Sequence, residues 1–238
     1  MNKKILITND DGIDALGLKI LVNTAKRFGD VTVIAPDGQR SASSHHCIFG
    51  KPLVIKEFDY DVEGVKAYSC SGTPADCARA GILKLMDPKP DIVLSGINDG
   101  YNISADIQYS GTVGAAMESV FNGVPAIAIS QGSFKSSEVT EHYLYDLLKE
   151  YIDKPLMHNQ IWNINFPDCK LEDCKGILRD RVVAMDKFYN DDFKVEDNGD
   201  GSYFYTGITE RIWEASEGTD LHAVANNYIS VGIVTNIS

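Results

Sequence analysis

The segment Ile5–Thr8 is an apolar run that leads directly into Asp10, Asp11 and Gly12. Such a run predicts a buried strand of a parallel sheet, and these sheets bind ligands beyond the carboxyl ends of their strands. Gly12 allows the backbone to depart from strand geometry, so that the two adjacent carboxylates can contact the same ligand. A hard divalent cation would relieve their mutual repulsion. The same residues also suit an ordinary turn or helix cap, so this segment alone leaves both interpretations open.

Helical and strand patterns alternate through the next 150 residues. Residues 15–27 carry apolar side chains at helical spacing, and residues 31–35 form another apolar run, which predicts a strand–helix–strand unit with a parallel crossover. Further strands are expected at 53–58, 65–70, 92–96, 124–130 and 161–167, and further helices at 73–85, after 110 and at 143–151. The expected fold class is α/β, with a Rossmann-like doubly wound, mostly parallel sheet in three α/β/α layers. No Gly-x-Gly-x-x-Gly follows the first strand, which argues against a dinucleotide cofactor.

The last third of the chain differs in composition from the rest. From about residue 168 it is acidic and rich in turns, with short strand candidates at Tyr203–Tyr205 and Tyr228–Val231 and a turn at Asn198–Gly201. We expect one domain over residues 1–238, with a wound core at about 1–167 and a β-rich C-terminal hairpin and tail extension at about 168–238. The extension is too poor in apolar residues to form its own core. In a monomer its strands would present unpaired edges and exposed rings, so we expect it to take part in oligomerisation.

Composition restricts the classes of function. A chain of 238 residues with 44% hydrophobic residues is long enough for an enzyme, and its formal charge of −12 argues against nucleic acid polymers as partners. The N-terminus leads straight into the first strand, and no apolar stretch has the length of a signal peptide or membrane span, so a cytoplasmic protein without a membrane partner is expected. The five cysteines form no Cys-x-x-Cys pair and are expected to be reduced thiols.

Two loops should reach the same edge of the sheet as Asp10 and Asp11. The loop at 39–46, rich in hydroxyl and imidazole side chains, follows the second strand, and the segment 97–102 follows the strand at 92–96. Loops of this composition are often plain polar connections, so their placement is the only argument for a role.

A glycine-rich turn opens the helix after residue 110. Free amides and the positive end of the helix dipole make such a turn suitable for an anion. Ser110 can act as the helix cap, but Gly111 and Gly114 each cost up to about 1 kcal/mol against alanine in a helix. Their presence therefore predicts a close approach of another group.

Taken together, these motifs resemble the SurE family of metal-dependent phosphatases, which act on nucleoside monophosphates. The resemblance is carried by Thr-Asn-Asp-Asp-Gly-Ile at 8–13, Pro-Asp at 36–37, Arg-Ser-Ala at 40–42, Ser-Gly-Thr-Pro-Ala-Asp-Cys at 71–77, Ser-Gly-Ile-Asn at 95–98, and Tyr-Ser-Gly-Thr-Val-Gly-Ala-Ala at 109–116. It covers the first two-thirds of the chain and is weaker after that, because Asn227 and Gly232 depart from the family's usual Gly-Tyr-Ile-Ser-Val-Thr-Pro run.

The resemblance implies a set of site residues and partners. It places one Mg²⁺ or Mn²⁺ per subunit on Asp10, Asp11, Ser41 and Asn98, with Asp10, Asp11 and Asn98 as catalytic residues, a phosphate-binding loop at Ser110, Gly111 and Thr112, and a candidate substrate loop of Arg40, His45 and Asn102. It also implies a homodimer, which can pair again into a tetramer.

The function expected is hydrolysis of nucleoside monophosphates, as a 5'-nucleotidase that can also accept 3'-monophosphates, with metal-activated water as the nucleophile. The hydroxyls of Ser110 and Thr112 are expected to donate to the phosphate. Two alternatives stay open at this point. One is a phosphatase of another substrate class with an aspartyl nucleophile, although that chemistry usually has Asp-x-Asp spacing. The other is a non-catalytic module that binds a metal or a nucleotide.

Overall fold

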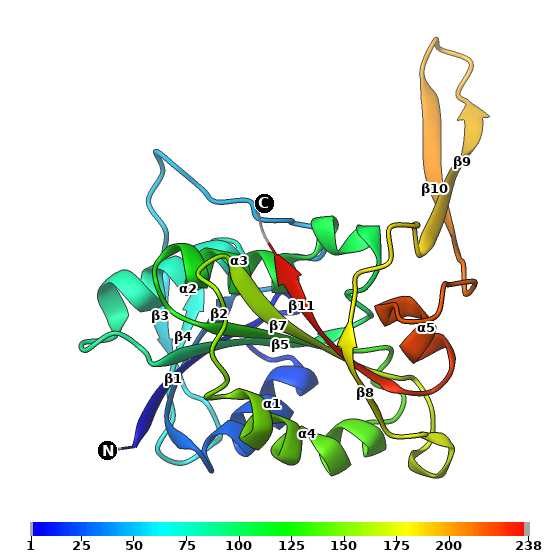
Figure 1. The fold of residues 1–238 in the computed structure, drawn as a ribbon. Coiled ribbons are helices and arrows are strands. Elements are labelled where there is room, and N and C mark those ends of the chain that lie inside the picture. Colours follow the sequence, from blue (N-terminus) through cyan, green and yellow to red (C-terminus); the bar gives the residue numbers. More distant parts are fainter. Residues whose placement is uncertain (1, 236–238) are drawn as a thin grey trace.

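A nine-stranded sheet runs through the centre of the protein (Figure 1), seen in a computed structural model that describes residues 2–235. The strand order is β3-β4-β2-β1-β5-β6-β7-β11-β8. The strands are β1 (Lys3–Thr8), β2 (Gly29–Pro36), β3 (Ile55–Phe58), β4 (Lys66–Cys70), β5 (Ile92–Asp99), β6 (Ala126–Gln131), β7 (Gln160–Phe166), β8 (Ile177–Arg181) and β11 (Ile229–Thr235). Neighbouring strands are parallel except in the pairs β3–β4 and β7–β11.

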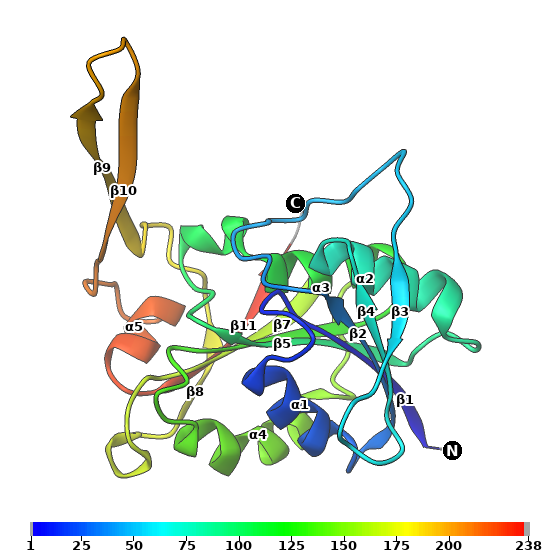
Figure 2. The same cartoon turned by 180° about the vertical axis from the view of Figure 1, so that it is seen from behind.

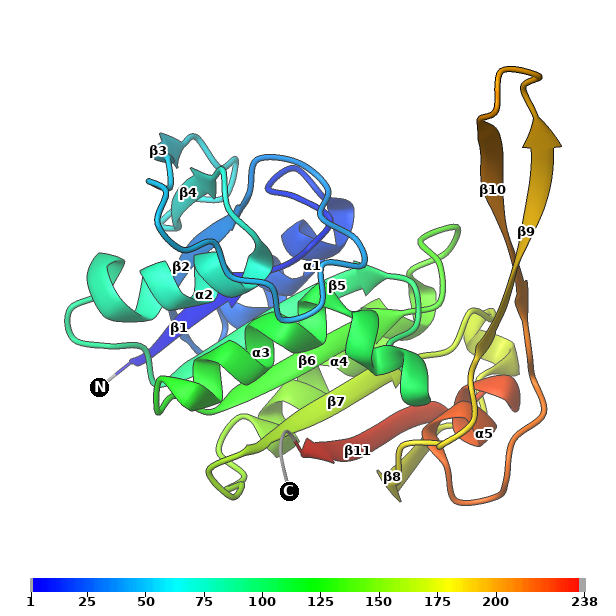
Figure 3. The same ribbon diagram turned by 90° about the horizontal axis from the view of Figure 1, so that it is seen from above.

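Helices cover both faces of this sheet (Figures 1 and 3). On one face lie α1 (Leu16–Ala25) and α4 (Glu138–Tyr151), and on the other lie α2 (Pro74–Ala80), its π-helical continuation η1 (Gly81–Leu85) and α3 (Gly111–Phe121). The short elements are η2 (Ala105–Tyr109), η3 (Leu171–Asp173) and α5 (Asp220–Ala225), which packs against β11. The predicted three-layer α/β fold is confirmed.

Local sequence explains where the main helices begin. Thr73 and Asp76 form a capping box at the start of α2, since each side chain accepts a hydrogen bond from the other residue's backbone N–H. Helix α4 begins five residues earlier than the expected Tyr143, because Val139 and Thr140 already pack inward. The acidic Glu138 and Glu141 also suit the positive end of its dipole.

The order of the strands determines where a ligand can bind. From β1 the chain passes through α1 to β2 on one side, and it later returns to place β5 on the other side of β1. The connections therefore diverge at the carboxyl ends of β1 and β5, and in open α/β sheets this switch point forms the ligand crevice. Asp10 and Asp11 directly follow β1, and Asn98 lies at the end of β5.

The C-terminal part of the chain completes the main sheet. We expected Tyr228–Val231 to leave an unpaired edge, and this expectation is wrong, because β11 lies between β7 and β8 and pairs with both. Ile229 and Val231 are fully buried. The wound core was expected to end at about residue 167, but β7 is not an edge strand: it is buried along almost its whole length and pairs with β6 on one side and with β11 on the other.

A long hairpin projects from the body of the molecule (Figures 1 and 2), formed by β9 (Tyr189–Asp197) and β10 (Tyr203–Arg211). Its turn lies at the predicted Asn198–Gly201. The two strands pair only with each other within the described residues, and the side chains of residues 190–211 are exposed. The hairpin predicted around Tyr203–Tyr205 is therefore present and contributes little to the core.

Two expectations from composition can be compared with the structure. All five cysteines are free thiols. Among residues 2–235, no helix has both the length and the apolar character needed to cross a bilayer.

Candidate active site

A cavity of about 360 Å³ opens at the switch point of the sheet. Of the predicted site residues, it is lined by Asp10, Ser41, Asn98, Asn102 and Ser110. These residues come from the ends of β1 and β5, the two loops that follow β2 and β5, and the N-cap of α3, so the fold brings together segments that are about 100 residues apart. A larger cavity of about 520 Å³ lies at the opposite end of the sheet, where the strands begin. Because parallel sheets bind ligands at the carboxyl ends of their strands, the smaller cavity is the candidate active site.

The turn after β1 fixes the direction of the two carboxylates. The Asn9 side chain donates to the carbonyl of Gly12 at 2.9 Å and accepts from its N–H at 3.2 Å. Gly12 has a φ of 101°, a conformation that favours glycine. This closed turn breaks the alternation of the strand. Asp10 lines the cavity, whereas Asp11 does not line it and contacts the neighbouring end of β5 instead.

Hydrogen bonds hold each carboxylate from a different element. One oxygen of Asp10, Oδ1, accepts from the hydroxyl of Thr112 at 2.6 Å, and Asp11 accepts from the backbone N–H of Asp99 at 2.9 Å. Asp10 is only 3% exposed, whereas Asp11 is half-buried. The carboxylates therefore link the end of β1 to α3 on one side and to the end of β5 on the other.

Burial makes the charged forms of both aspartates unfavourable when no cation is present. Burial raises the pKa of Asp10 to about 6; the Thr112 hydrogen bond lowers it and the charge of Asp11 raises it. Burial also raises the pKa of Asp11; the Asp99 N–H lowers it and the Asp99 charge raises it. A bound dication would reverse both shifts, because opposite charge nearby favours the ionised carboxylate.

The two other predicted ligands also offer oxygen atoms. The Asn98 amide donates its N–H to the carbonyl of Gly100 at 2.9 Å, which identifies its nitrogen and leaves its oxygen to accept. The Ser41 hydroxyl accepts from Gln39 at 2.9 Å and is exposed at the cavity. Carboxylate, amide and hydroxyl oxygens are the donors that Mg²⁺ and Mn²⁺ prefer, so the residues present fit such an ion.

The start of α3 lies directly against this carboxylate pair. Ser110 caps the helix by accepting from the N–H of Val113 at 3.0 Å. A Cβ on Gly111 would lie 2.5 Å from the Ser43 hydroxyl and 3.0 Å from the Asp10 Cβ. The close approach predicted from the two glycines is therefore present, and it brings the N–H groups of the first helical turn next to the candidate metal site.

Comparison with known proteins agrees with this arrangement. A sequence model of the family described as survival protein SurE matches residues 5–187. The chain belongs to the SurE family. The 5'-nucleotidase SurE of Carboxydothermus hydrogenoformans is 39% identical over 236 residues, covering 96% of this chain and 88% of that protein. The 5'-nucleotidase SurE of a Thermoanaerobacter species is 40% identical over 233 residues, covering 96% of this chain and 90% of that protein.

A solved SurE structure shows the same fold. The crystal structure of the SurE protein from Aquifex aeolicus is 34% identical and gives a TM-score of 0.84, covering 99% of this chain and 94% of that chain. The similarity therefore extends through the C-terminal third, where the sequence motifs were weaker.

In this SurE family member, the Thr112 side chain contacts a different group from the one expected. We expected its hydroxyl to face a phosphate, but the side chain is fully buried and donates to Asp10. A hydroxyl carries a single proton, so this donor is already used. The structure thus gives Thr112 a role in orienting Asp10, and Ser110 is the hydroxyl of the motif that lines the cavity.

The candidate substrate loop does not assemble at the cavity as a unit. Arg40 pairs with Asp37 at 2.6 Å and His45 points to Glu118 at 2.8 Å, and neither residue lines the cavity. Asn102 does line it, but this side chain is buried and donates to Ser130 at 2.7 Å. The sequence did not show that Arg40 would pair with Asp37 or that His45 would contact Glu118 on α3.

Several lining residues were missed in the sequence. Tyr189, Asp191 and Thr209, at the base of the β9–β10 hairpin, and Asp106 of η2 form another wall of the cavity. Asp106 holds this wall in place, since its carboxylate accepts from the N–H groups of Phe188 and Tyr189 at 2.5 and 3.1 Å. No local pattern marks these residues, because only the fold brings the hairpin base to the cavity.

We expect Gly114→Ala to lower the free energy of unfolding by about 1–3 kcal/mol, the usual range for overpacking. The new methyl group would overlap the carbonyl oxygen of Ser44, which belongs to backbone and cannot rotate away. Chemical denaturation measures the change. Gly207→Ala is the matched control, because a Cβ there meets no atom within 4 Å, and it should stay within about 0.5 kcal/mol. Equal stabilities of the two variants would contradict the close packing of the Ser44 loop on α3.

Proposed function

We propose that this chain is a 5'-nucleotidase, a metal-dependent phosphomonoesterase that hydrolyses nucleoside monophosphates. The observation that carries this proposal is the direct contact between a buried carboxylate at the end of β1 and the N-terminal turn of α3. In this proposal the contact would set a cation site at Asp10 beside an anion site at the start of α3. The 5'-nucleotidase name of the relatives supports the substrate class. The cavity volume of about 360 Å³ is in the range of small-molecule sites.

The metal in this proposal is one Mg²⁺ or Mn²⁺ per subunit. Asp10, Asp11, Ser41 and Asn98 would hold it through oxygen atoms. Such an ion supplies a Lewis acid for the phosphoryl oxygens and a lowered pKa for bound water. The chain itself contributes preorganisation, since Thr112 and Asp99 hold the two carboxylates before any ligand arrives.

The start of α3 would bind the transferred phosphoryl group. The amide of Gly111 and the hydroxyl of Ser110 are the donors, and the dipole of an 11-residue helix adds positive potential there. Negative charge grows on the phosphoryl oxygens and the leaving group during the reaction, so fixed donors at this point stabilise the transition state. Asp10 or Asp11 would orient the attacking water.

The proposed substrate partner is a nucleotide, and the proposed assembly is a homodimer that can pair again into a tetramer. The exposed apolar side chains of the hairpin support the assembly, as discussed below.

Phosphate release from a panel of nucleoside 5'- and 3'-monophosphates tests the proposed activity. We expect the full-length chain to hydrolyse 5'-monophosphates with Mg²⁺ or Mn²⁺, to lose activity in excess EDTA and to recover it when the metal is restored. Full activity in EDTA would refute the metal dependence. Nucleotide binding without phosphate release under any metal would instead support the non-catalytic module.

A further inference from the structure

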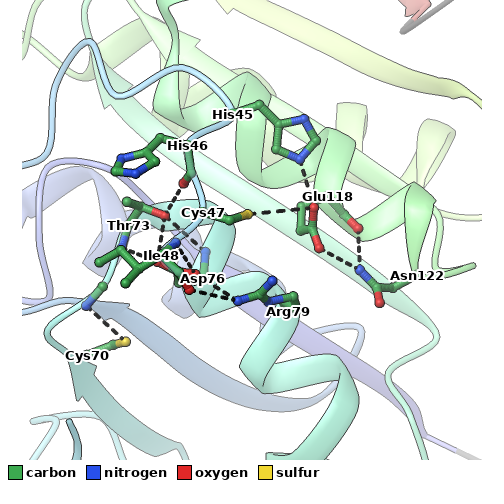
Figure 4. A network of polar contacts seen from close by, with 11 residues as sticks. His45, His46, Cys47, Ile48, Cys70, Thr73, Asp76, Arg79, Glu118 and Asn122 are labelled. Atoms are coloured by element: carbon green, nitrogen blue, oxygen red, sulfur yellow. Dashed lines mark hydrogen bonds and ion pairs between the residues drawn. The ribbon is translucent and has the colours of Figure 1, made fainter. Parts of the chain in front are cut away.

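Three side chains with different ligand atoms meet outside the candidate active site (Figure 4). The ligand atoms of His45, Cys47 and Glu118 all lie within 4.8 Å of one another. His45 Nε2 is 2.8 Å from Glu118 Oε2, and the Cys47 sulfur is 4.0 Å from the same oxygen. None of the three residues lines the 360 Å³ cavity, so the proposed nucleotidase site leaves this cluster unexplained.

The cluster joins a long loop to a helix. His45 and Cys47 belong to the connection between β2 and β3, which runs across the outer side of α2 and α3 (Figures 2 and 3). Glu118 lies on α3. The residues 37–54 of this connection contain no helix or strand, so contacts such as these must hold it in place.

Neighbouring residues orient the ligand atoms. The His45 ring stacks on Phe121 with ring centroids 5.3 Å apart. Asn122 donates to Glu118 Oε1 at 2.9 Å, which turns the other carboxylate oxygen toward the loop. The nearby Asp76 is already satisfied, because it accepts from the N–H of Ile48 and pairs with Arg79. Glu118 is therefore the carboxylate available to this cluster, with its outer partner already in place.

The surroundings of the Cys47 thiol are mostly negative, so a cation there would be favourable. Burial, together with the charges of Glu118 and Asp76, raises the pKa of Cys47 to about 11 against the opposing effect of Arg79. The thiol is thus a neutral group held close to a carboxylate. A divalent cation would convert it to a thiolate ligand, because metals deprotonate the thiols that coordinate them.

We propose that His45, Cys47 and Glu118 form a zinc site that fastens the 37–54 loop to α3. Nitrogen, sulfur and carboxylate ligands favour Zn²⁺. The candidate active site offers only oxygen ligands, which suit Mg²⁺ instead. Bond lengths to zinc place two ligands of a tetrahedral site roughly 3.3–3.8 Å apart. Binding therefore requires His45 and Glu118 to separate slightly and Cys47 to approach, and it leaves the fourth position to water. The same loop carries Ser41 and Ser43, so the zinc would also stabilise one wall of the active site.

Cobalt serves as the spectroscopic probe for this site. The full-length chain is stripped with EDTA, desalted and titrated with Co²⁺. We expect a near-ultraviolet thiolate-to-cobalt charge-transfer band that saturates at one equivalent and disappears when Zn²⁺ is added. Cys47→Ser should abolish the band. It should also weaken zinc binding by more than about 100-fold, because losing a ligand costs more than losing an outer partner. Asn122→Ala, which removes that outer partner, should weaken zinc binding by about 10- to 100-fold and keep the band.

Two control variants separate this site from other metal sites. Cys169→Ser changes a thiol at another half-buried position and should keep the band. Asp11→Asn disables the proposed nucleotidase metal site and should also keep it, so failure of either proposal can be recognised independently. If Cys47→Ser does not fold, as judged by circular dichroism, His45→Gln provides the second ligand variant. Absence of the band in the unmodified chain, or a band that depends on Cys169 instead of Cys47, would overturn the proposal.

Discussion

Asp11→Asn should reduce kcat/KM for a nucleoside 5'-monophosphate by on the order of 10³-fold, which corresponds to about 4 kcal/mol of transition-state stabilisation. The substitution removes one negative charge from the proposed metal site and keeps the shape of the side chain. The remaining amide oxygen can still accept from the N–H of Asp99, so the end of β5 should stay in place. Steady-state kinetics at several Mg²⁺ or Mn²⁺ concentrations measure the loss.

The dependence on metal concentration identifies the cause of that loss. If Asp11 holds the ion, the variant should need a higher metal concentration and recover part of its activity there, whereas a misfolded site would not recover. Asp14→Asn is the matched control, because it removes the same charge from an exposed position three residues later and should keep full activity. An Asp11→Asn enzyme with normal kinetics and a normal metal requirement would refute the assignment of Asp11 as a ligand.

The parts of the site that could be predicted are those encoded in short segments. An apolar strand that ends in Asp10 and Asp11 already specifies a carboxylate pair at the edge of a sheet, and β5 delivers Asn98 to the same edge. The two glycines at the start of α3 predicted a close approach, which Ser43 and Ser44 supply. In each case strand direction or backbone sterics acts over a few residues, so the sequence is sufficient.

The parts that could not be predicted depend on pairings across long separations. The hydroxyl of Thr112 is directed to Asp10 by the packing of α3 on β5 and β6, and no local pattern indicates this pairing. The same holds for β11, which lies between β7 and β8 because it pairs with the second edge of β7. Asp191 and Thr209 reach the cavity only because the hairpin is anchored beside it.

The hairpin is the feature of this chain that a monomer explains least well. Phe193, Tyr203, Phe204 and Tyr205 have exposed fractions between 55% and 64%, although large apolar side chains usually gain from burial. The pair also presents open strand edges to solvent, which can recruit another chain. These observations support the proposed homodimer, with the β9–β10 hairpin in its interface.

The structure changes the experiment that tests this idea. A cut after Met185 would be the simplest truncation by sequence, but it would remove β11 from between β7 and β8 and so test folding instead of assembly. A shorter hairpin avoids this difficulty. Phe193 and Gly207 face each other in the register of β9 and β10, so a two-residue Asn-Gly turn can join them in place of residues 194–206.

We expect this shortened hairpin to convert the dimer into a monomer and to leave the folded core intact. The deleted residues are exposed and lie outside the main sheet, and Asp191 and Thr209 at the cavity are retained. Light scattering should report twice the 26.1 kDa chain mass for the unmodified protein and close to one chain mass for the variant. Met157→Ser is the matched control, since it removes an apolar side chain that is 66% exposed elsewhere and should keep the dimer. If the unmodified chain is a monomer, the proposed homodimer is wrong. If the shortened variant is still a dimer, the interface lies outside the hairpin.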